Sequence, residues 1–366
     1  MAVALVTNVI APYRVELYRL LAERHDVEVL CFGGDQRYVP AWFGDLDGQL
    51  RAAPFPARRL AGPRAALALG RRYRAAIAPV AGGAMLPATY LGMRAARRPF
   101  VLWASVWAHP RGGLASALAF PLLRHVYRHA DAVVTYGPHV SRYVARWRGR
   151  HDDVLVAPQS VEAARFGRAV AAEEIAAFRR AHGLGDGPLA LFVGRLVPEK
   201  GIAPLLAAWR EVVRARPAAT LAVAGDGPLA AQVRAAPGVR LLGPLARDAL
   251  PVAYAASAAL VVPSIPTPRF REPWGLVCNE AMHQGTPVIA TDAVGAAAGG
   301  LVRDGSTGLV VPAGDAGALA AAIGRLLDDP ATAARLGDAG RRAVAAHTYA
   351  AMADAFGAAL ARAGVR

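Results

Sequence analysis

The stretch LFVGRLVPEKGIAPLL, residues 191–206, contains the structural unit on which the second half of the chain is built. An apolar run ends at Val193, Gly194 permits a tight turn, and apolar residues at helical spacing follow from Ile202. This order predicts a buried strand, a short loop and a helix, the repeating unit of a parallel sheet. The loop also holds Lys200, the one Lys among 42 Lys and Arg residues. A compact ammonium in an Arg-rich chain marks a candidate binding position.

The same unit recurs along the sequence. The segment 50–78 is rich in Arg, Ala and Pro and gives no clear pattern, whereas 159–188 is polar, Gly-punctuated and partly helical, as expected of a linker. Apolar runs predict strands at 2–10, 26–32, 100–106, 131–137, 153–158, 189–196, 219–227, 239–245, 258–264, 286–292 and 307–313. Helical spacing predicts helices at 12–25, 114–129, 201–215, 228–235, 274–284, 315–327, 331–346 and 348–363.

This alternation predicts an α/β protein with two doubly wound parallel sheets. A length of 366 residues favours two domains, an N-terminal domain at 1–160 and a linker with a second domain at 161–345. Ligands of such folds bind beyond the carboxyl ends of the strands. We therefore expect the site in a central cleft that the two domains face.

The composition excludes several classes of protein. Hydrophobic residues make up 55% of the chain and charged residues 19%, as in ordinary folded domains. Cys31 and Cys278 stand far apart and in no metal-binding spacing, which favours a reducing compartment without disulfides. No secretory leader and no apolar run of about 18 residues is present, so we expect a cytoplasmic protein, at most peripheral at the inner face of a membrane.

The net charge of +15 is concentrated in the first half of the chain. Residues 1–165 hold 22 Arg against 11 Asp and Glu, and the interval from Asp47 to Asp131 holds 13 Arg and no acidic residue inside it. Such a field attracts anionic lipid, a phosphorylated substrate or nucleic acid, and a solvated basic face is an equally good explanation. Nucleic acid is the least favoured partner, because no known binding module is present.

Two further groups of residues indicate chemistry. Arg195 and Lys200, beside the end of a predicted strand, suit two adjacent phosphates. In REPWGLVCNEAMHQGTPVIATD (271–292), Glu272 and Glu280 are separated by seven residues, and Gly275 allows a ligand to approach the backbone. Amides at the start of the following helix suit an anion, and the carboxylates suit the vicinal hydroxyls of a sugar or ribose.

Taken in order, GRLVPEKG, AGDGPL, GPL, VVPS, the 271–292 segment and DGSTGLVVPAGD resemble the nucleotide-sugar-binding half of the GT-B glycosyltransferases. The retaining GT4 family (glycosyl transferases group 1), marked by an E-x7-E element, is the most similar group. The resemblance covers residues 185–345. It implies two Rossmann-like domains, and a terminal segment, 346–366, that packs back on the N-terminal domain.

The resemblance also implies roles for residues of the second half. Arg195 and Lys200 correspond to the pair that binds the donor diphosphate, Glu272 to the carboxylate on the transferred sugar, and Glu280 to the one on the ribose. The remaining donor-binding residues implied are Trp274, Gly275 and Leu276 at the backbone turn, Leu245 at the nucleobase, and Ser264 in the Pro-Ser element.

The N-terminal half resembles the acceptor domain more loosely. His109 follows a predicted strand where the family has a His near the reacting centre, and Asn8 and Arg14 lie in a first loop that lacks the family's usual glycine pair. Gln159 and Glu162 stand where Asn and Asp are usual. The DLD at 45–47 spells a metal-binding motif of another enzyme class, but it lies in a Gly-flanked turn, so no metal or other cofactor is expected.

The resulting hypothesis is a retaining, metal-independent transfer of a sugar from a UDP- or GDP-sugar to an acceptor hydroxyl. Arg195, Lys200, Glu272 and His109 are the catalytic candidates. The acceptor is a small metabolite or natural product, or a lipid-linked or cell-envelope glycan. The alternative function is a GT-B protein that binds a nucleotide sugar without catalysis.

Overall fold

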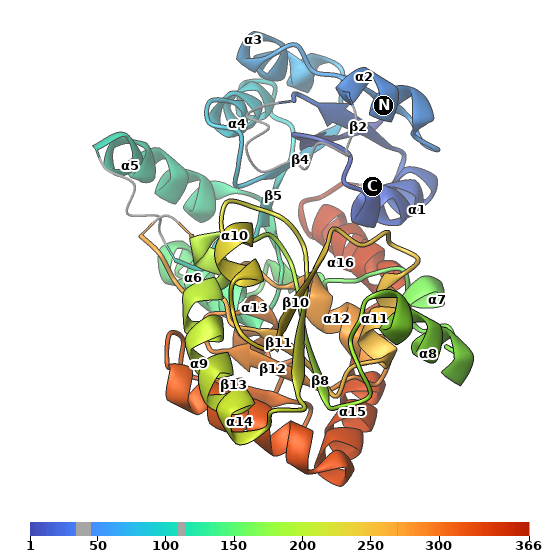
Figure 1. Cartoon of the computed structure of the whole chain (residues 1–366). Coiled ribbons are helices and arrows are strands. Elements are labelled where there is room, and N and C mark those ends of the chain that lie inside the picture. Colours follow the sequence, from blue (N-terminus) through green and yellow to red (C-terminus); the bar gives the residue numbers. More distant parts are fainter. Residues whose placement is uncertain (34–44, 109–113, 269, 366) are drawn as a thin grey trace. The chain divides into compact units, whose positions relative to one another are not determined.

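The computed structural model describes residues 1–33, 45–108, 114–268 and 270–365, with the backbone alone at 114–118. The chain divides into two compact units. Unit 1 comprises residues 1–159 and 348–366, and unit 2 comprises residues 160–347. The chain thus leaves unit 1 once and returns to it with its last helix (Figure 1).

Unit 1 is built on a parallel sheet whose seven described strands have the order β3-β2-β1-β4-β5-β6-β7. Its central strands are fully buried, as the apolar runs predict. The strand order reverses between β1 and β4, which pair with each other. The strands are β1 (Val3–Thr7), β2 (Val27–Cys31), β3 (Ala57–Arg59), β4 (Ala75–Pro79), β5 (Phe100–Ala104), β6 (Ala132–Thr135) and β7 (Val154–Val156).

Helices cover the sheet of unit 1. The last helix of the chain, α16, packs beside α1 (Figure 1), and Met352 and Phe356 enter the same core as Leu17 and Leu21. Burial of this apolar stripe attaches the C-terminal segment to unit 1. The helices are η1 (Pro12–Arg14), α1 (Val15–His25), α2 (Leu46–Ala52), α3 (Pro63–Leu67), η4 (Leu69–Arg71), α4 (Met85–Ala95), α5 (Leu114–His129), α6 (Pro138–Arg148) and α16 (Tyr349–Arg362).

Unit 1 differs from the sequence expectations in four places. The DLD at 45–47, expected in a turn, forms the start of α2. The predicted helix at 12–25 is a short 3-10 turn, η1, followed by α1. The segment 50–78, which gave no pattern, contributes β3, α3, η4 and β4. Helices α4 and α6 were not predicted. Helix α4 carries buried residues on most of its surface and so shows no simple apolar stripe. Helix α6 does show one, at Val140, Tyr143, Val144 and Trp147, and sequence analysis overlooked it.

Unit 2 repeats the architecture with a sheet of six described parallel strands in the order β10-β9-β8-β11-β12-β13. Here the order reverses between β8 and β11, which also pair. Both sheets are therefore doubly wound, as the sequence predicts. The strands are β8 (Leu189–Val193), β9 (Thr220–Ala224), β10 (Val239–Gly243), β11 (Ala259–Val262), β12 (Val288–Thr291) and β13 (Leu309–Val311).

The segment expected to be a linker is part of unit 2. Its two helices, α7 and α8, pack against α11 and α12, and the Gln284 side-chain amide donates to the Phe166 carbonyl at 2.6 Å. Polar composition misled the prediction, because helices at the surface bury few residues. The helices are α7 (Ala163–Phe166), α8 (Ala172–Ala181), η5 (Pro198–Lys200), α9 (Ile202–Ala215), α10 (Ala230–Arg234), α11 (Leu250–Ala255), α12 (Leu276–His283), α13 (Gly295–Ala298), α14 (Ala316–Asp328) and α15 (Pro330–Val344).

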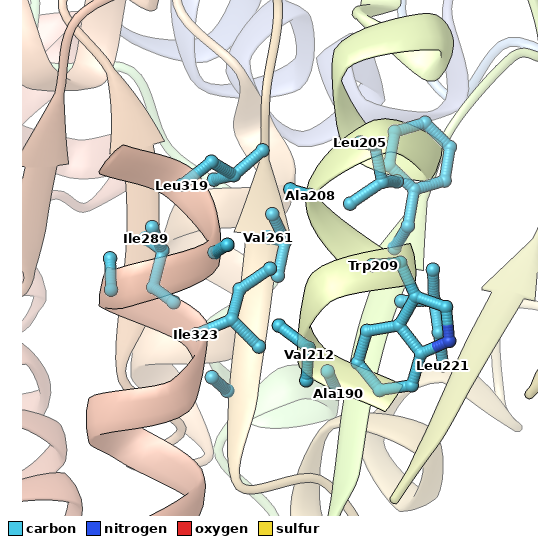
Figure 2. Close-up of a cluster of buried hydrophobic side chains, with 14 of the residues drawn as sticks. Ala190, Leu205, Ala208, Trp209, Val212, Leu221, Val261, Ile289, Leu319 and Ile323 are labelled. Carbon is cyan, nitrogen blue, oxygen red and sulfur yellow. The ribbon is translucent and has the colours of Figure 1, made fainter. Parts of the chain in front are cut away.

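The main core of unit 2 lies between the sheet and two helices on one of its faces. Figure 2 shows Trp209 and Val212 of α9 and Leu319 and Ile323 of α14 around the strand residue Val261. All five side chains are at most 2% exposed. This packing places the start of α9, and with it Lys200, at a defined position beside the sheet.

Membrane-spanning structure is not found in the described ranges: none of their helices combines the length and the apolar composition needed to cross a bilayer.

Gly201 provides a test of how tightly the loop after β8 is packed. Its φ is +71°, and a Cβ there would lie 1.9 Å from the Pro263 carbonyl oxygen. Gly183 has a similar φ of +60° but open space around its Cβ position. We expect both Ala substitutions to cost about 1–2 kcal/mol for the left-handed backbone, and Gly201→Ala to cost more because the Pro263 backbone must move. Urea unfolding of the two variants measures the difference; equal losses would contradict the close approach.

Candidate functional site in unit 2

The candidate donor site lies beyond the carboxyl ends of β8 and β11, where the strand order of unit 2 reverses. In doubly wound sheets the loops diverge at this point and leave a crevice for a ligand. Residues 194–200 follow β8, and residues 263–265 follow β11. The backbone amide of Ile265 donates to the Glu199 carbonyl at 3.0 Å, which joins the two loops.

Lys200, Ser264 and Glu272 meet at this point. The Lys200 ammonium forms an ion pair with Glu272 Oε2, and the Ser264 hydroxyl donates to the same oxygen at 3.1 Å. Ser264 is itself held, because the Thr291 hydroxyl at the end of β12 donates to its carbonyl at 2.5 Å. Glu272 is only 7% exposed, so its charge requires these partners. Three residues singled out in the sequence thus form one cluster.

Arg195 is the second cation of this site. It follows Gly194 at the end of β8, and its guanidinium lies 3.8 Å from the Glu199 carboxylate, with both side chains partly exposed. A contact of this length at a partly exposed site is weak. The Arg195 side chain is 35% exposed at the end of β8, so a ligand anion can reach it.

The turn at 272–275 presents its backbone, not its indole ring. Trp274 is 3% exposed and donates from Nε1 to Asn279 Oδ1 at 2.7 Å, so its side chain is fixed in the interior. The turn is held by backbone bonds from Gly295 to Glu272 and from Ala296 to Trp274. Gly275 has a φ of +91° and begins α12 with no side-chain cap, which leaves the amides around Leu276 for an anion.

Glu280 lies on α12, and its hydrogen-bond partner is not a member of the Lys200 cluster. It accepts a hydrogen bond of 2.5 Å from the Tyr254 hydroxyl on α11. Burial raises the pKa of Glu280 to about 7, although Tyr254 and the charge of Arg247 both favour the carboxylate. Burial and the neighbouring Glu280 raise the pKa of Tyr254, which keeps it a donor.

In the sheet order, β9 and β10 follow on one side of β8, so the AGDGPL turn after β9 and the loop after β10 come next to this site. Leu245 is half-buried, two residues beyond β10. In the AGDGPL turn, a Cβ on Gly225 would lie 1.9 Å from the Gly194 carbonyl, and one on Gly227 would lie 2.6 Å from that of Leu196. The two glycines thus permit close packing against the Arg195 loop, which explains them without a dinucleotide-binding role.

The acceptor-side candidates belong to unit 1. Asn8 is exposed directly after β1, whereas Arg14 is buried at the start of α1. His109 lies outside the described residues. In the DLD decoy, the Asp45 side chain caps α2, and Asp47 pairs with Arg59 at 2.8 Å.

No cluster of three or more His, Cys, Asp or Glu side chains suited to a metal occurs within the part of the chain that the structure describes. The expectation of a metal-independent site therefore stays a prediction.

Sequence analysis missed the residues that hold the site residues in place. Tyr254, Asn279, Thr291 and Glu199 each contact a predicted site residue or its loop. Glu199, Asn279 and Thr291 lie inside the quoted motifs but were given no role there, and only folding brings Tyr254 to Glu280. The contact between Asn279 and Trp274 has no helical spacing, because Trp274 precedes α12 and the two residues are five positions apart.

Comparisons with known proteins identify the class. A model described as "Glycosyl transferases group 1" matches residues 187–329, and one described as "Glycosyl transferase 4-like domain" matches residues 10–160. The GDP-mannose-dependent alpha-(1-6)-phosphatidylinositol monomannoside mannosyltransferase of Mycolicibacterium smegmatis is 34% identical over 279 residues, 71% of this chain and 69% of that protein. The D-inositol 3-phosphate glycosyltransferase of Nocardia farcinica is 33% identical, over 66% of this chain and 57% of that protein.

The fold has close counterparts among solved structures. Anabaena HepE in complex with UDP-glucose matches with a TM-score of 0.78 and 20% identity, over 99% of both chains. Two doubly wound units with this similarity define the GT-B fold. The chain belongs to the group 1, GT4-type glycosyltransferases. It is an enzyme that uses a nucleotide sugar.

Glu280 gives a pH-dependent prediction. Its folded-state pKa of about 7 lies above the ordinary 4.5, so the proton it holds stabilises the folded state fully below pH 4.5, and this stability is lost as pH rises through 7. We expect the free energy of unfolding of the wild type to fall, relative to Glu280→Gln, between pH 5 and pH 8. Urea unfolding across this range measures it. Glu173→Gln, at an exposed position of α8, is the control, and parallel curves for wild type and Glu280→Gln would contradict the prediction.

Proposed function

We propose that this enzyme transfers a hexosyl group from a UDP- or GDP-sugar to an acceptor hydroxyl, with retention of configuration and without a metal ion. The observation that carries the proposal is the cluster of Lys200, Ser264 and Glu272 beyond the strand reversal of unit 2. It combines a cation for the diphosphate with a buried carboxylate for sugar hydroxyls in one place.

When the donor binds, Lys200, Arg195 and Glu272 exchange their partners within the chain for groups of the donor. The diphosphate takes Lys200 and Arg195 as counter-ions, together with the amides at the start of α12. Glu272 then accepts hydrogen bonds from hydroxyls of the transferred sugar. Glu280 accepts from the ribose, and the backbone near Leu245 frames the base. The ion pair of Lys200 with Glu272 keeps both groups satisfied before the donor binds.

Transfer is a front-side displacement. The bond between the anomeric carbon and the β-phosphate oxygen breaks, and a bond from that carbon to the acceptor oxygen forms on the same face. The acceptor proton passes to the departing phosphate oxygen. Negative charge grows on the diphosphate as it leaves, and Lys200, Arg195 and the α12 amides stabilise it. This charge stabilisation replaces that of a divalent cation.

The names of the relatives support specific first substrates. Two mycobacterial relatives are named as GDP-mannose-dependent, and HepE was solved with UDP-glucose. GDP-mannose and UDP-glucose are therefore the first donors to test. The acceptor is a small metabolite, as the inositol 3-phosphate relative supports, or a lipid-linked glycan, as the phosphatidylinositol mannoside relative supports. A lipid acceptor would bring the enzyme to the inner face of an anionic membrane.

Lys200→Ala is the first test of donor binding. We expect UDP or GDP to raise the Tm of the wild type with or without magnesium, since a ligand at 100 times its Kd stabilises by about 2.7 kcal/mol. The same ligand should stabilise Lys200→Ala much less, and kcat should fall by about 10²–10³-fold. A thermal-shift panel of UDP, GDP, ADP, dTDP and CDP, with magnesium or EDTA, measures the first effect.

The matched control is Arg234→Ala, which removes an exposed cation from α10 of the same unit and should leave the shift unchanged. A shift that requires magnesium would contradict the metal-independent mechanism. Binding without any transfer to sugar acceptors or water would favour the non-catalytic alternative.

Glu272→Gln tests the reaction path. We expect kcat/KM to fall by about tenfold or more, since a hydrogen bond to a charged group contributes about 1.5–3 kcal/mol. The residual product should keep the donor's anomeric configuration, as read from NMR of the anomeric proton. If azide restored turnover of this variant and gave a glycosyl azide of inverted configuration, Glu272 would instead be a nucleophile in a two-step mechanism.

A further inference from the structure

A cavity lies within unit 1, at the place in its sheet that corresponds to the candidate donor site of unit 2. It has a volume of about 290 Å³ and is lined by residues that follow β1, β4, β5 and β6, among them Asn8, Ala81, Ser105 and Tyr136. The strand order of unit 1 reverses between β1 and β4. This cavity therefore occupies the position where a doubly wound sheet binds a ligand.

Arg14 forms one wall of the cavity, and it is a buried cation with neutral partners. It is 5% exposed. Its Nη2 donates to Gln159 Oε1 at 2.6 Å and to the Tyr136 hydroxyl at 3.1 Å, and its Nη1 lies 3.4 Å from the Met352 sulfur. Among the described residues, no carboxylate forms an ion pair with it, and the cavity lining contains no Asp or Glu.

Aromatic rings enclose the same guanidinium. Its Cζ lies 5.0 Å from the Trp103 ring centre, 5.2 Å from that of Tyr13 and 5.3 Å from that of Tyr136. Such rings and neutral acceptors retain a cation in a low-dielectric site but leave its charge uncompensated. An oxyanion that enters the cavity gains a charge-assisted interaction that water screens little.

An apolar groove adjoins this cavity. Val80 and Ala81 line both, and the groove adds about 210 Å³ between the start of α4 and the middle of α5. Leu86, Leu122 and Leu123 supply its walls, and Leu122 remains 42% exposed. Among the described residues, none that lines the groove is charged. A site with one cation at one end and an apolar groove at the other matches an amphiphile.

We propose that unit 1 binds an amphiphilic phosphate ester as the acceptor: its phosphate enters the Arg14 cavity and its hydrocarbon chain lies in the Leu86–Leu122 groove. This assignment rests on the proposed function for its role in transfer, and on the unit 1 residues alone for binding. It selects the lipid-linked acceptor over a free metabolite, because a metabolite leaves the groove unused.

Three small probes separate the parts of the site. n-Octyl phosphate carries head and chain, methyl phosphate carries the head alone, and n-octanol the chain alone. Isothermal titration calorimetry of the full chain at 0.15 M salt should show octyl phosphate binding most tightly. If methyl phosphate binds as tightly as octyl phosphate, the groove is not used and the lipid assignment is wrong.

Substitutions test which residues bind the phosphate and which bind the hydrocarbon chain. Arg14→Gln should weaken octyl and methyl phosphate by about 10–100-fold and leave octanol unchanged, as expected for the loss of a charged hydrogen bond. Leu122→Ser should weaken octyl phosphate and octanol by about fourfold or more, the effect of one buried methylene, and leave methyl phosphate unchanged. The controls are Arg71→Gln, which removes an exposed cation of unit 1, and Leu67→Ser, which changes an exposed Leu outside the groove.

Asn8→Asp keeps the test valid if Arg14→Gln unfolds, because Asn8 is exposed on the cavity rim and its replacement adds only a negative charge. It should weaken both phosphates and spare octanol. Unchanged phosphate affinity in Asn8→Asp, or equal losses in Arg71→Gln, would overturn the assignment. Titration of UDP and GDP into the wild type and the same variants distinguishes the two proposals. If the wild type binds neither nucleotide, the donor function is rejected. If it binds a nucleotide but not octyl phosphate, only this inference is rejected.

Discussion

The ion pair between Lys200 and Glu272 depends on two places where the backbone comes too close for any side chain. Gly201 lies against the Pro263 carbonyl, and a Cβ on Gly295 would lie 2.0 Å from the Pro273 carbonyl. These approaches bring together loops from β8, β11 and β12, and so allow residues 72 positions apart to share one hydrogen bond. The burial of Glu272 then makes the pair necessary, since an isolated carboxylate there would be strongly destabilising.

Both units have a cation beyond the point where the strand order reverses, but the groups that surround this cation differ in charge. In unit 2, carboxylates of the chain itself balance the cations beyond the strand reversal, Arg195 with Glu199 and Lys200 with Glu272. In unit 1, neutral oxygens and aromatic rings surround Arg14. A cation with an internal counter-ion exchanges partners when an anion binds, whereas a cation without one attracts the anion directly. If both proposals hold, an anion displaces an internal counter-ion in unit 2 and meets an uncompensated cation in unit 1.

Much of the fold was predictable from local pattern. The central strands of both sheets are apolar runs long enough to be buried on both faces, and their alternation with helices predicts doubly wound sheets. Prediction failed where the pattern is weak. Strand β4 (Ala75–Pro79) is Ala-rich, α4 is buried on most sides, and α7 and α8 were attributed to a linker because few of their residues are buried. The pairing of Glu280 with Tyr254 was not predictable, since it joins two helices whose packing no local pattern specifies.

By itself the sequence determined the class of protein, and it predicted which residues form the donor site. The motifs between Arg195 and Glu280 consist of strand ends, glycine turns and a helix start, which are local features that a sequence shows directly. The tertiary structure alone decided which charges meet, that Trp274 faces inward, that burial raises the pKa of Glu280, and that Arg14 has no carboxylate partner among the described residues. These properties depend on distance and desolvation, and both arise only when segments remote in sequence pack together.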